Sequence, residues 1–145
     1  MIYLSLIAII FLLIAFLYVV SLQKNRGRSS EGRIVYDPKY PDQKWQEIET
    51  IFNLKGESHF IKAIIEADKL IDYTLKGKKI SGETFAERLK KARNLFDNSF
   101  DYDNLWTAHK VRNEIVHQTG YEITHAEAKR ILEFYKKSLA IIRIK

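Results

Sequence analysis

Cysteine is absent from the 145-residue sequence, and so is any charged side chain before Lys24. Without cysteine the chain forms no disulfide and has no thiolate, so a metal ion would need histidine and carboxylate ligands. Internal repeats, low-complexity tracts and a glycine-rich phosphate loop are also lacking. A hydrophobic content of 46% and a charged content of 29% are typical of a folded protein. The length allows one compact domain with an appendage.

The uncharged start is almost entirely apolar from residue 2 to residue 22, where only Ser5 and Ser21 interrupt it. A helix rising about 1.5 Å per residue would extend about 31 Å over this run, which matches the hydrocarbon core of a bilayer. A cleaved signal peptide would need a basic start and a small-residue cleavage site, and neither is present. We therefore expect residues 1–23 to form a transmembrane anchor that contacts the lipid bilayer through residues 2–22.

Basic residues follow the apolar run at once, at Lys24, Arg26, Arg28 and Arg33. Translocating these charges is unfavourable, so we expect a single-pass membrane protein with its N-terminus outside and its soluble domain in the cytoplasm. Residues 24–41 then form a basic flexible linker. The formal net charge of +6 favours an anionic partner such as nucleic acid or lipid headgroups, or else it reflects a solvated, lysine-rich surface.

From residue 42 to residue 145 the apolar residues recur with helical spacing, and no segment alternates like a half-buried strand. Short polar breaks separate the helices, which favours an all-α fold with a four- or five-helix up-and-down bundle. The predicted helix boundaries are Ser58 as an N-cap, capping boxes at Thr84/Glu87 and Thr124/Glu127, a fourth helix that starts at Asp101 or Asp103, and a stop at Gly120.

The fourth predicted helix carries the side chains best suited to chemistry. Arg112 lies at the edge of its apolar face, His109 and Asn113 lie next to that edge, and His117 follows one turn after Asn113. Arg112 and His117 are about 140° apart around the helix, so one regular helix does not bring their side chains together. A loosened helix end or a second copy of the helix would be needed. The face expected to be buried consists of Ala108, Val111 and Ile115.

Two segments of the sequence resemble a known family. The run LWTAHKVRNEIVHQ, preceded by AIIEADKLIDYTLK and followed by a capped terminal helix, is similar to HEPN domains, and more closely to those of small membrane-anchored bacterial proteins. The resemblance covers roughly residues 42–139. It implies an all-α bundle and, as in many HEPN domains, a metal-independent ribonuclease with an Arg-x4–6-His motif, here Arg112 and His117. Such ribonucleases usually pair, so the resemblance also implies a homodimer whose two motifs line one cleft.

The reaction that the resemblance implies is attack of a ribose 2′-hydroxyl on the adjacent phosphodiester of RNA, without a metal or a cofactor. Histidine suits the proton transfers because its ordinary pKa lies near physiological pH, and arginine suits the phosphate because its planar fork offers paired donors. The expected catalytic residues are therefore Arg112, His117 and Asn113, the last of which would orient either partner. His109 would help to position these residues without contacting the RNA itself.

A different role for the same residues is also consistent with the sequence. Arg112 would pair with a nearby carboxylate such as Glu114 or Asp68, and His117 would stabilise the C-terminal end of its helix through its charge. The domain would then be a non-catalytic scaffold that recruits a protein or nucleotide partner to the membrane. Burial of Arg112 or His117 in an ion pair within one bundle would favour this alternative.

Overall fold

The computed structural model describes residues 12–18 and residues 36–145, which belong to two separate compact units. Residues 12–18 are helical. Most of the predicted anchor at residues 1–23 and of the predicted linker at residues 24–41 lies outside the described residues. Within the described part of the chain, no helix has the length and apolar character needed to cross a membrane.

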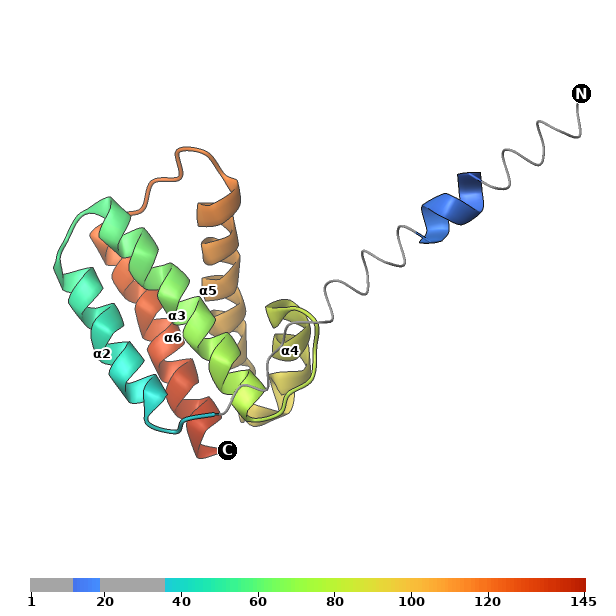
Figure 1. Cartoon of the computed structure of the whole chain (residues 1–145). Coiled ribbons are helices and arrows are strands. Elements are labelled where there is room, and N and C mark those ends of the chain that lie inside the picture. Colours follow the sequence, from blue (N-terminus) through green and yellow to red (C-terminus); the bar gives the residue numbers. More distant parts are fainter. Residues whose placement is uncertain (1–11, 19–35) are drawn as a thin grey trace, which may run out of the picture. The chain divides into compact units, whose positions relative to one another are not determined.

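The second unit confirms the all-α prediction, because residues 36–145 contain helices and no strand. Four of its helices are long, and Figure 1 shows that they form a bundle in which successive long helices run in opposite directions. A short α-helix and a 3-10 turn connect the second and third of them. The elements are α2 (Tyr40–Asn53), α3 (Glu57–Gly77), α4 (Phe85–Lys91), η1 (Ala92–Leu95), α5 (Ser99–His117) and α6 (His125–Ile144).

The core of the bundle is built around α3, which packs against α2, α5 and α6. Ile64, Ile71 and Leu75 recur on one face of α3 and are fully buried. From the other helices, Leu105 of α5 and Ile131 of α6 are also fully buried. Burying an aliphatic side chain of this size contributes about 1.5–3 kcal/mol. These side chains hold α5 and α6 against the same stretch of α3, where the polar site described below also lies.

Of the four predicted helix starts, those at Thr84 and Thr124 are confirmed, and those at Ser58 and at Asp101 or Asp103 are wrong. The Thr84 and Thr124 side chains accept hydrogen bonds from the backbone N–H three residues later, so both N-caps form. The Glu87 carboxylate accepts from the Glu83 backbone N–H at 2.8 Å, one residue before the N-cap, so the box at Thr84 is not closed in the usual way. Ser58 does not cap α3, because the helix begins one residue earlier, at Glu57. The N-cap position belongs to Gly56, whose φ of 100° favours glycine.

The predicted limits of α5 also differ from the structure. The helix begins at Ser99 rather than at Asp101 or Asp103, because the Asn98 side chain caps it by accepting from the Asp101 backbone N–H at 2.9 Å. It ends at His117, before the glycine expected to stop it. Gly120 adopts a φ of 75° in the loop that follows.

Packing on α3 predicts a large loss of stability for Ile64→Ala. The change removes a fully buried side chain and leaves a cavity, so the free energy of unfolding should fall by about 2–5 kcal/mol. Ile144→Ala is the matched control, since that side chain is 85% exposed. Urea unfolding of the full chain in detergent, followed by circular dichroism, measures both variants. Similar losses in the two variants would contradict this assignment of the core.

Candidate functional site

A buried carboxylate joins three helices at the centre of the bundle. Asp68 lies on α3 with 4% of its surface exposed. Its Oδ1 accepts a hydrogen bond from the Tyr135 hydroxyl of α6 at 2.9 Å. The same oxygen lies 2.8 Å from Nδ1 of His109 on α5. Asp68 therefore ties α5 and α6 to α3 through polar contacts in addition to the apolar core.

The contacts of Asp68 continue along α5 and close into a ring of four side chains. Because a carboxylate only accepts, His109 donates from Nδ1, and Nε2 of the neutral imidazole is left as an acceptor. Asn113 donates to this Nε2 at 3.1 Å and accepts from Arg112 Nη1 at 3.0 Å. Arg112 Nε lies 3.4 Å from Asp68 Oδ2, which completes the ring. We call Asp68, His109, Asn113 and Arg112, together with Tyr135, the polar network.

Arg112 therefore forms an ion pair with Asp68, one of the two carboxylates that the sequence suggested. Its Nε is buried and makes no aligned hydrogen bond, so the contact with Asp68 at 3.4 Å is electrostatic rather than a directed bond. About 25% of the Arg112 side chain stays exposed. The Arg112 guanidinium thus lies at the edge of the bundle, and its Nε faces the buried Asp68 carboxylate.

Aromatic rings enclose His109 on the sides that the polar network leaves open. The ring of Phe85, from α4, meets the imidazole edge-on with centroids 4.6 Å apart, and the Trp106 centroid is 6.1 Å away. Only 7% of His109 is exposed. Both of its ring nitrogens have partners, so His109 is a fully engaged member of the network and not an open base.

Tyr135 and Asp68 are the members of the polar network that were not predicted as site residues. Burial raises the pKa of the Tyr135 hydroxyl well above its ordinary value, the Asp68 carboxylate adds to the rise, and Arg112 opposes it. Tyr135 therefore remains a proton donor to Asp68 at physiological pH. The sequence does carry a signal for Asp68, since it occurs four residues after Ile64 and three before Ile71, on the buried face of α3.

His117 stands apart from the polar network. It is the last residue of α5 and is exposed, and within residues 36–145 its side chain has no hydrogen bond or ion pair. Because α5 remains α-helical through His117, the helix end is not loosened and the predicted divergence from Arg112 persists in one chain. The structure thus brings Arg112, Asn113 and His109 together and leaves His117 outside. The catalytic assignment of these residues stays a prediction.

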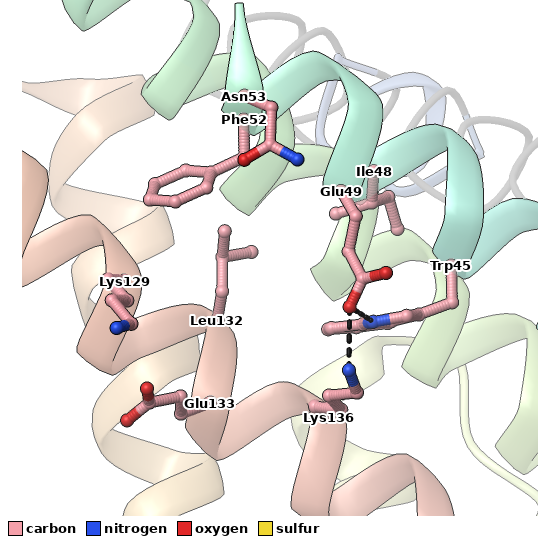
Figure 2. Close-up of a pocket in the computed structure, with 9 residues that line it drawn as sticks. All are labelled: Trp45, Ile48, Glu49, Phe52, Asn53, Lys129, Leu132, Glu133 and Lys136. Carbon is pink, nitrogen blue, oxygen red and sulfur yellow. Dashed lines mark hydrogen bonds and ion pairs between the residues drawn. The ribbon is translucent and has the colours of Figure 1, made fainter. Parts of the chain in front are cut away.

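A separate groove of about 270 Å³ lies between α2 and α6. Figure 2 shows Glu49 at its rim, where the carboxylate accepts from the Trp45 indole N–H at 2.8 Å and pairs with Lys136 at 2.6 Å. The bond from Lys136, with that from Trp45, lowers the pKa of the Glu49 carboxyl. The groove is lined by Trp45, Ile48, Glu49, Phe52, Asn53, Lys129, Leu132, Glu133 and Lys136.

No protein-family model matches this chain, and no curated protein or solved structure matches it significantly. The resemblance to HEPN domains therefore rests on the sequence segments alone. In the part of the chain that the structure describes, no three histidine, aspartate or glutamate side chains gather as metal ligands.

The burial of Asp68 predicts that Asp68→Asn destabilises the bundle. The amide removes the negative charge that faces Arg112 and turns one acceptor into a donor, so the free energy of unfolding should fall by about 1–3 kcal/mol. Asp103→Asn is the control, because Asp103 is exposed on α5. Urea unfolding of the full chain provides the comparison. If the two variants lose the same stability, Asp68 does not hold the three helices together.

Proposed function

We propose that this chain is a membrane-tethered, HEPN-like helical domain that recruits a protein partner to the cytoplasmic face of a membrane and does not cleave RNA as a single chain. The engagement of Arg112 by the buried Asp68 carries the proposal. An arginine that binds the phosphate of RNA must present its positive charge to solvent. Here a carboxylate 3.4 Å away offsets that charge and would repel a phosphate brought beside it.

The groove between α2 and α6 is the surface that we assign to the partner. Its volume of about 270 Å³ lies below the range of about 300–1,000 Å³ that is usual for small-molecule sites, so it suits one inserted side chain better than a nucleotide. Trp45, Ile48, Phe52 and Leu132 supply an apolar lining. The charged lining residues are two glutamates and two lysines, which offer no net attraction to a polyanion. An apolar or aromatic side chain of a protein is the occupant that fits this chemistry.

This proposal predicts that Phe52→Gln releases the partner. Phe52 lines the groove and is half-buried, and the amide would place an unpaired polar group against the inserted side chain. A photo-crosslinker at the neighbouring Asn53, in the full chain within native membranes, reports partner contact as cross-linked adducts quantified by mass spectrometry. We expect Phe52→Gln to reduce the adduct several-fold.

Phe100→Gln is the matched control for this experiment. Phe100 is 68% exposed and does not line the groove, so this variant should give the adduct yield of the unsubstituted chain. Arg112→Ala should keep the adduct as well, because it removes a contact of the polar network and not of the groove. Equal adduct yields from Phe52→Gln and Phe100→Gln would exclude the groove as the docking surface.

RNA cleavage by a homodimer is the second candidate function, and one observation favours it. About a quarter of the Arg112 side chain is exposed, and His117 is exposed at the end of the same helix. A second copy of the chain could therefore approach both groups. His117 of one copy would then transfer the proton of the ribose 2′-hydroxyl, while Arg112 would bind the phosphate under attack.

A cleavage assay separates the two candidates. The full chain in detergent is incubated with RNA in EDTA, and we expect no cleavage above that of a His117→Ala variant. If RNA is cleaved and His117→Ala lowers the rate by about 10²–10⁴-fold, the range for a lost proton-transfer group, the second candidate is correct and the first is overturned. His125→Ala is the control, since His125 is an exposed histidine of α6 outside the motif. His117 is the decisive position because Arg112→Ala also breaks the ion pair with Asp68.

A further inference from the structure

The chain enters the bundle at Tyr36 and Asp37, which lie at the C-terminal end of α3. The Tyr36 ring stacks on Tyr73 with centroids 5.6 Å apart, and the Asp37 backbone N–H donates to the Tyr73 hydroxyl at 2.9 Å. Tyr36 also lies directly over Gly77, where a Cβ atom would collide with its ring. These contacts fix the point from which the chain leads toward the predicted membrane anchor.

The same end of the bundle is rich in basic side chains. Residues 76–93 contain seven lysines and arginines and only two glutamates. Two of the seven, Lys76 and Arg88, pair with Asp72. The other five have no carboxylate partner among the described residues, and we call them the basic end: Lys78, Lys79, Lys90, Lys91 and Arg93.

Hydrogen bonds hold two members of the basic end, Lys78 and Lys91, near the last turn of α3, and Figure 1 shows α4 beside that turn. Lys91 donates to the Ser81 hydroxyl at 3.0 Å, which ties α4 to the loop after α3. Lys78 donates to the backbone carbonyl of Arg143 at 3.2 Å, which ties the end of α6 to the same place. Lys79 and Lys90 are exposed. The partners in these bonds are neutral, so they leave the positive charge uncompensated.

Elsewhere on the bundle, four lysines of the long helices pair with carboxylates. Lys44 and Lys69 both pair with Glu66, Lys136 pairs with Glu49, and Lys137 pairs with Asp101. Lys62, Lys110 and Lys129 have no such partner among the described residues, but they lie far apart in the chain. The five side chains of the basic end fall together just after Gly77, which the Tyr36 ring covers. Such a concentration attracts anions over about one Debye length, about 8–10 Å at physiological salt.

We propose that the basic end binds the phosphates of anionic lipid headgroups in the same membrane that the predicted anchor, residues 1–23, would cross. This inference rests on the proposed membrane tether. Twelve residues, 24–35, can span at most roughly 40 Å whatever their conformation. So short a tether keeps the end of the bundle at a high effective concentration beside the headgroups. A soluble RNA has no such advantage, which is why lipid is favoured over RNA.

The absence of cysteine allows a clean test with single labels. The full chain with Asn94→Cys, next to the basic end, carries a fluorescent donor and is placed in nanodiscs with an acceptor on the headgroups. We expect energy transfer to be higher in discs that contain phosphatidylglycerol than in discs of phosphatidylcholine alone. High salt and the triple variant Lys79→Gln/Lys90→Gln/Lys91→Gln should both return it to the phosphatidylcholine value.

Two controls make the result specific. The triple variant Lys55→Gln/Lys62→Gln/Lys110→Gln removes the same charge from exposed positions outside the basic end and should keep the phosphatidylglycerol response. A donor at Asn53→Cys, at the opposite end of the bundle, should respond much less. Equal transfer from Asn94→Cys in both lipids, with the chain incorporated, overturns the inference but not the tether.

Two further outcomes are decisive against the proposal. If the chain does not insert into the discs, the proposed membrane tether is wrong, and so is the lipid assignment that depends on it. If added RNA abolishes the phosphatidylglycerol response, the basic end prefers a nucleic acid, and lipid is the wrong partner.

Discussion

The buried carboxylate of Asp68 is the constraint on which the rest of the bundle depends. Removing an ion from water costs several kcal/mol, so a buried carboxylate persists only where donors surround it. Here the partners come from two of the three long helices that pack on α3. His109 of α5 and Tyr135 of α6 donate hydrogen bonds, and Arg112 of α5 adds an ion pair. A shift of either helix along α3 would leave Asp68 short of partners. The apolar core makes the helices associate, and Asp68 selects the register in which they do so.

The sequence predicted local features of this fold well, because local features depend on neighbouring residues. The N-caps at Thr84 and Thr124 need only residues within one helical turn, and both form. The start of α5 differs from the prediction because Asn98 precedes Asp101 and Asp103 and is as good an N-cap as they are. Several capping residues in a row leave the start of a helix undetermined until its packing is known.

The polar network could be anticipated only in part. Its α5 members follow from helical spacing, which placed Arg112, His109 and Asn113 near one edge. The sequence suggested Asp68 or Glu114 as the carboxylate that pairs with Arg112. Helix packing decides for Asp68, because Asp68 faces the bundle interior. Tyr135 is sixty-seven residues from Asp68 in the chain, and only tertiary structure brings their side chains together. A single sequence records the chemistry of each helix but not which faces meet.

The proposed contacts also determine how the bundle would stand on a membrane. The basic end lies where α3 finishes, and after α4 and η1 the chain turns back so that α5 runs away from that end (Figure 1). Nineteen helical residues extend about 28 Å, so His117, at the far end of α5, would be held well clear of the headgroups. The groove between α2 and α6 would open to the side, where a cytoplasmic protein can reach it without displacing lipid. Membrane contact, partner binding and the exposed histidine would then occupy three different faces of one small bundle, so each can be altered without disturbing the others.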